Sequence, residues 1–286
     1  MSNILFKSLS FSVVFILAIA CQSIDNQNDE YYSDETISGE DSSMLQDDIN
    51  LADGSIPIFY NMYLSVEMTS LFENIGASYE PGILNPIEKS DEYLMSTKKA
   101  MNLGVYAVDL SYAKVFQEYD RAGKYLSMMH ELSEELGIPS EHFINTTRRI
   151  ENNITNKDSL YKIANEIYMT TDSYLKENDR EGAAALIVMG GWIEAMYIAS
   201  KIYESGVNDA DFLSRVADQK YSLKDLIDLL DDYKDDEAIS KHLPKLKKLK
   251  DKFDGFTVDY DNTKPAIQNM EEVVPVIQDI RNDIVS

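Results

Sequence analysis

The sequence predicts an all-α protein, an antiparallel helical bundle built around one buried central helix. Three observations support this fold class. Helix formers dominate a chain of 286 residues that contains only 12 Gly and 7 Pro, and no alternating run of β-branched residues indicates a strand. Apolar residues recur at helical spacing in successive segments. The links between these segments are short, which favours antiparallel neighbours.

The central helix is predicted between Asp179 and Gly206, because its middle is apolar on every side. Such a helix is either a membrane span or the axis of a helical domain. About 17 apolar residues is the low end for crossing a bilayer, and Glu194 in a span costs roughly 2.5 to 3.5 kcal/mol. We therefore predict a core helix with Asp179 at its N-cap and Gly206 just past its end. Gly190 and Gly191 would let a neighbouring helix approach closely.

The N-terminus resembles the export signal of a bacterial lipoprotein. Residues 1–20 carry Lys7, an apolar run and small residues, as a secretory signal peptide does. Residues 17–21, Leu-Ala-Ile-Ala-Cys, resemble a lipobox, although Ala18 stands where leucine is commonest. The resemblance implies that Cys21, the single cysteine of the chain, is acylated and becomes the first residue of the mature protein. The alternative is a plain signal peptide with an incidental cysteine.

Residues 21–55 are predicted to form an acidic, disordered tether. Between Gln22 and Gly54 there are ten acidic residues and no Lys or Arg. Low hydrophobicity with charge of one sign does not support a packed core. A flexible chain of this length spans roughly 30 Å, so a folded domain can stand clear of a lipid surface.

Residues 56–286 are predicted to be a single all-helical domain. Before the central helix, helices are expected over about 57–75, 90–117, 120–136, 140–152 and 158–176. Gly104 is expected to bend the second of these helices. Asp120 is expected to cap the third, and Gly137 to end it.

After the central helix the sequence predicts shorter pieces. Helices are expected over 209–218 and 222–233, the second beginning with a Ser222 and Asp225 pair that resembles a capping box. A helix interrupted by Pro244 follows, and then a helix over 265–285 that is kinked at Pro275.

The middle of the chain contains a weak internal similarity. The segment from Tyr112 to Gly123 resembles the segment from Tyr174 to Gly182, with an Asp-Arg pair before an apolar helix in both. Two copies about 60 residues apart would form a duplicated helical hairpin. A coincidence is the alternative, since repeat proteins usually show three or more units.

The best candidate site is a set of polar residues on helices that otherwise look like core. Its members are Tyr106, Asp109, Tyr112, Asp172, Glu194 and Tyr197, with Lys201 farther along the row of Glu194. Carboxylates on apolar helices can act as acids or bases when burial raises their pKa. They can equally be structural, because a buried carboxylate that accepts tyrosine hydroxyls fixes helix register. We expect Tyr106, Tyr112 or Asp109 to lie beside Glu194.

A second candidate is a basic surface close to the C-terminus. It consists of six lysines that directly follow an acidic run: Lys241, Lys245, Lys247, Lys248, Lys250 and Lys252. Such a stripe can contact lipid phosphates or an acidic partner. The alternative, which we favour, is a solvated helix face whose lysines pair with nearby acids.

Composition and motifs exclude several classes of protein. A formal net charge of −24 argues against nucleic-acid binding, which needs a basic face. The three histidines are scattered, so the sequence predicts no metal site. Neither a Gly-rich phosphate loop nor a nucleophile elbow is present, and no cofactor is expected. These observations favour a protein that is not an enzyme.

The lipobox-like start, the acidic tether and two internal segments resemble uncharacterised all-helical lipoproteins of Bacteroidetes-type bacteria. The internal segments are 102–112, NLGVYAVDLSY, and 190–194, GGWIE. The resemblance implies an envelope lipoprotein of the outer membrane and implies no activity. The leading hypothesis is a non-enzymatic binding or assembly subunit, anchored to the membrane by lipid, with a protein partner in the envelope. The alternative is a small-ligand receptor or acid/base enzyme with a pocket around Glu194 and Asp109.

Overall fold

The computed structural model describes residues 77–138, 173–174, 177–178, 180 and 182–286. The predicted signal peptide and tether, the helices expected over 57–75 and 140–152, and most of the helix over 158–176 lie outside the described residues. So do residues 175–176, 179 and 181 in the second segment of the internal similarity, and the duplication stays a prediction.

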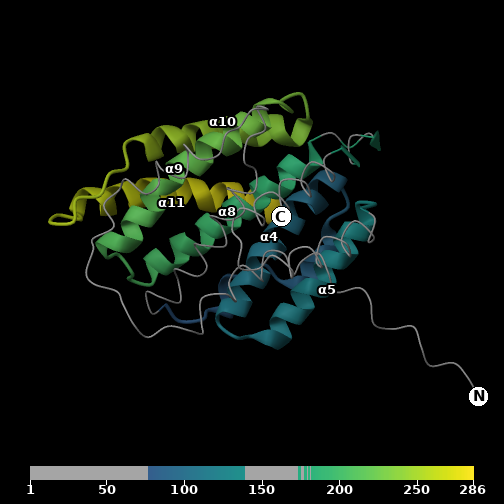
Figure 1. The fold of residues 1–286 in the computed structure, drawn as a ribbon, viewed down its shortest axis with the longest axis horizontal. Helices are drawn as coiled ribbons and strands as arrows, with labels where there is room; N and C mark the ends of the chain where they lie inside the picture. The colour runs from purple at the N-terminus through teal and green to yellow at the C-terminus, as the bar shows by residue number, and fades with distance from the viewer. Residues whose placement is uncertain (1–76, 139–172, 175–176, 179, 181) are drawn as a thin grey trace, which may run out of the picture.

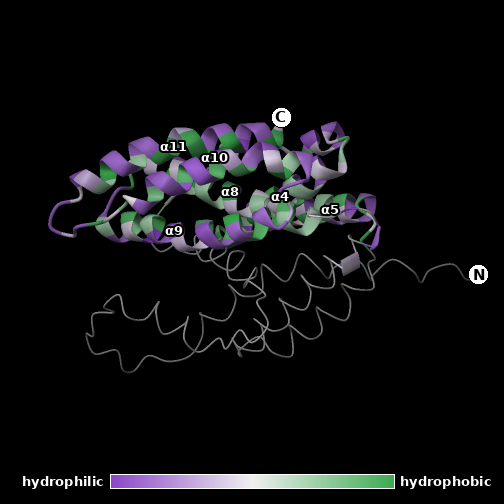
Figure 2. Ribbon diagram, turned by 90° about the horizontal axis from the view of Figure 1, so that it is seen from above, coloured by the Kyte–Doolittle hydropathy of each residue, from purple (hydrophilic) through white to green (hydrophobic). Residues whose placement is uncertain are grey.

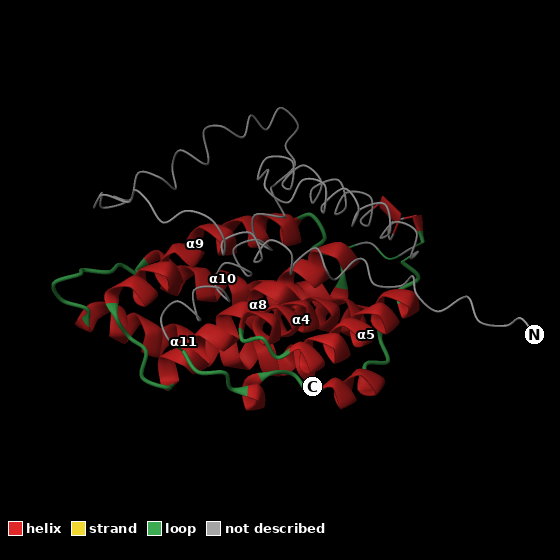
Figure 3. Cartoon of the chain, turned by 60° about the horizontal axis from the view of Figure 1, so that its bottom comes forward, coloured by secondary structure: helices red, strands yellow, loops and turns green. Residues whose placement is uncertain are grey.

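The described residues form two 3-10 helices and six α-helices, and no strand occurs among them (Figure 3). The elements are η1 Pro81–Ile83, η2 Ile87–Glu92, α4 Ser96–Val115, α5 Tyr119–Glu135, α8 Ala183–Glu204, α9 Ala210–Asp231, α10 Glu237–Asp254 and α11 Lys264–Val285. The all-α helical bundle predicted from the sequence is confirmed.

Helix α8 is the axis of this bundle, as predicted. It packs against α4, α9 and α11, and its most extensive contact is with α4. Figure 1 shows α8 between α4 and α5 on one side and α9, α10 and α11 on the other. Apolar residues line the inward faces of the helices and hydrophilic ones the outward faces (Figure 2). This arrangement buries the apolar stripes that the helical spacing predicts.

Among the described helices, α8 is the one whose length and composition would suit a membrane span. Within the most apolar 18-residue window of α8, 83% is buried inside the structure. Trp192 illustrates this burial, since the ring is 1% exposed and its Nε1 donates to Ser222 Oγ on α9 at 2.9 Å. The environment of α8 is that of a core helix in a bundle.

Two glycines bring α4 and α8 into backbone contact. A Cβ atom added at Gly190 would lie 1.9 Å from the Met101 carbonyl oxygen, and one at Gly104 would lie 2.0 Å from that of Ile187. Neither distance is compatible with a side chain. At Gly191 the nearest atom would be 3.5 Å away, an ordinary contact. The predicted close approach is therefore confirmed for Gly190, and Gly104 serves the same contact from α4.

Several predicted helix starts are wrong. Helix α4 begins at Ser96, while Ser90 belongs to η2. Helix α5 begins at Tyr119, which places Asp120 inside the first turn and not at the cap. Helix α8 begins at Ala183 after Gly182, which has a φ of 76° and provides no side-chain cap. Asp179 lies outside the described residues.

The predicted helix ends at glycine are confirmed. Gly137 and Gly206 follow α5 and α8 with φ values of 67° and 106°. These positive φ values favour glycine, which adopts the left-handed region without a steric cost.

The two helices predicted over 209–218 and 222–233 are one continuous helix, α9. Asp209 caps it, its side chain accepting from Phe212 N at 3.0 Å. Ser222 does not begin a helix, and it is buried in the interior of α9. Its hydroxyl lies 3.0 Å from the Gln219 carbonyl, and it accepts from Trp192. Because a tertiary hydrogen bond uses the hydroxyl, the local capping signal was misleading.

Helix α10 continues through Pro244, contrary to the predicted interruption. Proline inside a helix costs about 3 kcal/mol. The apolar face of α10 offsets this cost, because Ile239, Leu246 and Phe253 are all fully buried. Pro275 also lies within a continuous helix, α11.

Candidate functional site

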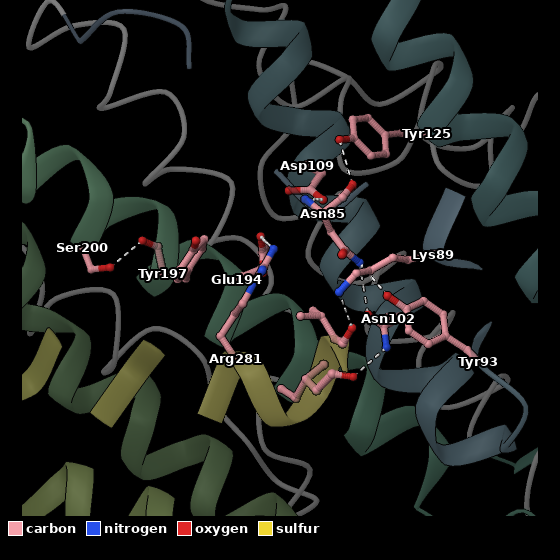
Figure 4. Close-up of polar contacts among 12 residues, drawn as sticks. Asn85, Lys89, Tyr93, Asn102, Asp109, Tyr125, Glu194, Tyr197, Ser200 and Arg281 are labelled. Atoms are coloured by element: carbon pink, nitrogen blue, oxygen red, sulfur yellow. Dashed lines mark hydrogen bonds and ion pairs between the residues drawn. The ribbon is translucent and has the colours of Figure 1, made fainter. Parts of the chain in front are cut away.

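Three helices bring a carboxylate pair and an arginine together in the core (Figure 4). Glu194 of α8 is 0% exposed and Arg281 of α11 is 8% exposed. Arg281 Nε donates to Glu194 Oε2 at 3.0 Å, and its Nη2 donates to Oε1 at 3.1 Å. This two-bonded geometry is the strongest arrangement available to a guanidinium and a carboxylate. We call Asp109, Glu194 and Arg281 the buried cluster.

Tyr197 completes the arginine site. Its ring centroid lies 4.3 Å from the guanidinium carbon of Arg281. Tyr197 stands one turn after Glu194 on α8, so the two side chains share a face of the helix. The guanidinium therefore has a carboxylate at its edge and an aromatic ring against its face, which compensates for the loss of water.

Asp109 of α4 adds a second acid to the cluster. Its Oδ2 accepts from the backbone N–H of Asn85 at 3.0 Å. Its Oδ1 is buried and has no hydrogen-bond donor among the described residues. Burial and the nearby charge of Glu194 raise the pKa of Asp109 well above its ordinary value, while Arg281 opposes this shift.

The charges of the buried cluster balance if its two acids hold one proton. Burial also raises the pKa of Glu194, although Arg281 and Asp109 favour its ionised form. Burial disfavours the charged form of Arg281, but the charge and hydrogen bonds of Glu194, together with Asp109, outweigh this effect, and the pKa of Arg281 is raised. With Asp109 protonated, its hydroxyl can donate to Glu194, and the cluster is neutral. An unpaired negative charge in the core would be far more costly.

A network of neutral polar groups extends from Asp109. Asn85 is fully buried, and its Nδ2 lies 2.9 Å from Tyr93 Oη and 3.3 Å from Asn102 Oδ1. The Asn85 carbonyl accepts from Tyr125 Oη at 3.1 Å. The network therefore fixes the segment before α4 to α4 and α5 through buried hydrogen bonds.

The same network reaches the C-terminal turn of α11. Asn102 Nδ2 donates to the Ile284 carbonyl at 3.0 Å, and Lys89 Nζ donates to the Val285 carbonyl at 3.1 Å. Lys98 Nζ donates to the carbonyls of Asp283, Ile284 and Ser286. These donors satisfy carbonyls that have no partner within the helix, and the cations complement the negative end of its dipole.

The residues predicted as one cluster fall into two groups. Asp109, Glu194 and Tyr197 meet at Arg281. Tyr106 Oη donates to the Pro86 carbonyl at 2.9 Å, away from Glu194. Tyr112 Oη accepts from Glu80 N at 3.2 Å. Of the three residues expected beside Glu194, Asp109 is the one that interacts with it, whereas the main partner of Glu194, Arg281, was not expected. Asp172 lies outside the described residues.

Three residues of the site, Arg281, Asn85 and Asn102, were not predicted from the sequence. Arg281 carried a signal that could have revealed it: it lies on the apolar stripe of α11, between Ile277 and Ile284. A basic residue on a core-facing stripe needs a buried acidic partner. Asn85 stands in a loop, and no sequence pattern distinguishes it from an exposed turn residue.

The lysines of α10 lie on the surface and are largely paired with acids. Lys245 Nζ lies 2.7 Å from Asp279 and 2.6 Å from Asp283. Further pairs join Lys247 to Asp231 at 2.9 Å, Lys250 to Asp254 at 2.6 Å and Lys252 to Glu272 at 3.0 Å, and Lys241 lies 3.9 Å from Asp283. Lys248 makes no ion pair within the described part of the chain. This pattern supports the solvated, paired face that we favoured.

Chemically, the buried cluster can hold a proton, and its two acids have no direct contact with solvent. Asp109 and Glu194 are both 0% exposed. No group of three or more His, Cys, Asp or Glu side chains among the described residues is placed to hold a metal ion. The arrangement is suited to fixing α4, α8 and α11 in one register.

Comparison with known proteins adds no relative. No family model, curated protein or solved structure matches the chain.

Proposed function

We propose that this protein is a lipid-anchored protein of the bacterial cell envelope, with a helical bundle that acts as a non-enzymatic binding or assembly subunit. The observation that supports a binding role best is that the acids of the buried cluster have no contact with solvent. Its acids are the most enzyme-like groups of the bundle, yet both are sealed from solvent and Arg281 occupies Glu194. Groups placed in this way stabilise a surface for presentation and do not contact a substrate.

Anchoring through Cys21 is the part of the proposal that the N-terminal sequence supports. The test is metabolic labelling with an alkyne fatty acid in a bacterial host that processes lipoproteins. Wild-type protein should incorporate the label and partition into detergent. Cys21→Ala should lose both properties. A label retained by Cys21→Ala would contradict the anchor.

The binding role is tested by site-specific photo-crosslinking in intact cells. Tyr221 and Tyr260 are 50% and 64% exposed, and each can be replaced by a photoreactive phenylalanine without disturbing the core. A discrete crosslinked species from one exposed site, absent when the probe replaces another exposed residue such as Tyr119, is expected. Uniform or absent crosslinking at all sites would oppose the proposal.

The enzyme alternative has its own test. An acid/base role for the buried cluster requires that Glu194→Gln abolish turnover in a folded protein. We expect Glu194→Gln to change stability, as described below, and to leave the crosslinked species unchanged at a temperature where circular dichroism shows the variant folded.

A further inference from the structure

A cavity of about 280 Å³ lies where the loop before α4 meets the C-terminal end of α8. Its lining includes Glu80, Ile83, Tyr112, Lys201, Ile202 and Val207, and it includes neither Asp109 nor Glu194. The volume is just below the range typical of drug-sized ligands. The cavity is thus a separate site, suited to a molecule of only a few heavy atoms.

Part of the cavity lining is apolar, beside the polar side chains of Ser78 and Ser205. Ile202 is 4% exposed, and Ile83 and Val207 are half-buried and pack against the core. An aliphatic chain placed against these side chains removes apolar surface from water, which stabilises a complex. The ligand therefore needs a short hydrocarbon portion.

Lys201, the one cation among the described residues of the lining, is already neutralised. Lys201 Nζ lies 2.7 Å from Glu204 Oε2. Gln278 Nε2 donates to the other oxygen of Glu204 at 2.8 Å, and the carboxylate is thereby held in place. The pKa of Glu204 is lowered, with hydrogen bonds from Lys201 and Gln278 outweighing its partial burial. An anionic ligand would have to displace this pair.

The remaining electrostatic features of the cavity are negative. Glu80 is exposed at the cavity and makes no ion pair among the described residues. The last turn of α8, which includes Lys201 and Ile202, directs the negative end of the helix dipole toward the same place. Tyr112 contributes its hydroxyl to the lining, because its ring is buried and packs against Tyr79 and Phe116. Because Lys201 is paired with Glu204, the carboxylate of Glu80 beside the aliphatic side chains of the lining matches a small organic cation.

We propose that this cavity binds a primary alkylammonium group on a short aliphatic chain, with the ammonium at Glu80 and the chain against Ile83, Ile202 and Val207. Such a group occurs in free aliphatic amines and in the side chain of a lysine presented by another protein. The site is additional to the proposed function and does not depend on the lipid anchor.

The test is an isothermal titration calorimetry experiment in which pentylammonium chloride is titrated into the full-length protein. We expect millimolar affinity for pentylammonium and no saturable binding of pentanoate, which has a similar chain and the opposite charge. Glu80→Gln should weaken pentylammonium binding at least fivefold. Glu88→Gln, which removes an exposed acid outside the cavity, should change it less than twofold and so controls for the acidic surface.

A second pair of variants tests the location independently of charge. Val207→Phe fills the cavity and should abolish saturable binding. Val258→Phe makes the same change at another half-buried position outside the cavity and should leave binding intact. Circular dichroism confirms that each variant is folded.

Three outcomes would overturn the proposal: equal binding of pentanoate, binding that survives both Glu80→Gln and Val207→Phe, or no saturable binding of pentylammonium. Titration with an N-acetylated, C-amidated lysine compares the two sources of the group. Tighter binding than pentylammonium supports a lysine side chain, and weaker binding supports a free amine. Cys21→Ala should leave every titration unchanged, so failure of the anchor and failure of this site are distinguishable.

Discussion

Acids pair with bases both in the buried cluster and in the lysine stripe of α10, which is the row of surface lysines from Lys241 to Lys252. The two regions differ in solvent access. Glu194 is 0% exposed, and its partner Arg281 has a side chain that is 9% exposed. Lys245 also makes two ion pairs, yet its side chain is 33% exposed and that of Asp279 is 63% exposed. The distances are similar, so geometry alone does not distinguish the two regions.

The difference teaches that burial determines the consequence of losing a partner. At the surface, water replaces a lost partner, and exposed pairs contribute about 0 to 1 kcal/mol. In the core nothing replaces it, and the remaining charge is left desolvated. The stripe therefore favours solubility, while the buried cluster fixes the helices. Four substitutions can break or sharpen this contrast.

The largest effect is expected for Glu194→Gln, which leaves the buried guanidinium of Arg281 without its carboxylate. We expect a loss of about 3 to 5 kcal/mol in the free energy of unfolding, measured by urea denaturation at pH 7. The double variant Glu194→Leu with Arg281→Met removes both charges and should recover much of this loss. A Glu194→Gln variant as stable as the wild type would mean that the pair is not effectively buried.

Gly190→Ala tests the packing that seals the buried cluster. An added Cβ would lie 1.9 Å from the Met101 carbonyl oxygen, and the rigid backbone of α4 must shift. Overpacking of this kind costs about 1 to 3 kcal/mol. The matched control is Gly191→Ala, for which we expect no loss and a gain of up to about 1 kcal/mol from helix propensity. Equal effects in thermal unfolding would contradict the backbone contact.

Asp109→Asn tests the shared proton through its pH dependence. Because the pKa of Asp109 is raised above 3.8, the folded state keeps a proton that the unfolded chain releases above about pH 4. Stability from this group is therefore lost as the pH rises through that window. Asparagine mimics the protonated acid, so the cost of the substitution should be at most about 1 kcal/mol near pH 4.5 and should shrink or reverse by pH 8.

The measurement for Asp109→Asn is urea unfolding of the wild type and the variant at both pH values. Burial lowers the pKa of His242 to about 4, so this histidine gives the opposite slope between about pH 4 and 6.5. Both proteins contain His242, and its contribution cancels in their difference. A difference that grows more unfavourable with rising pH would show that Asp109 is ionised in the folded protein.

The smallest effect is expected for Lys245→Gln. Although it removes two short ion pairs, the groups are well solvated, and we expect a change of about 0 to 1 kcal/mol. The effect should disappear in 0.5 M salt, because exposed pairs are screened. Lys248→Gln, which removes a lysine of the same helix that has no ion pair within the described ranges, is the control. A loss comparable to that of Glu194→Gln would end the distinction between the two regions.

Much of the fold could be predicted from the sequence, because helix periodicity is local. A few helical turns of sequence encode the apolar face of α10, the apolar character of α8 and the helix ends at Gly137 and Gly206. Helix starts were less predictable. Ser222 has the sequence features of an N-cap, yet its hydroxyl accepts a hydrogen bond from Trp192, which lies on another helix. Ser222 itself lies inside α9, which is continuous.

The candidate site was only partly predictable, since its residues are distant in sequence. Glu194 could be singled out as an acid on an apolar helix, and Asp109 as its companion. Arg281, the ion-pair partner of Glu194, is 87 residues away in the sequence. No spacing rule connects them, and the contact depends on how α11 crosses α8. Asn85 was missed for the same reason, as its role depends on a loop that packs against α4.

The sequence by itself determined that the chain is helical, acidic and organised around α8, because composition and periodicity are properties of short segments. It also indicated that Glu194 needs a partner, because an isolated acid in a core is unstable. Only the tertiary structure decided that the partner is Arg281, that Gly104 and Gly190 bring α4 against α8, and that a cavity opens beside Glu80. These features arise from the packing of segments far apart in the chain, where backbone contact and desolvation determine which groups meet.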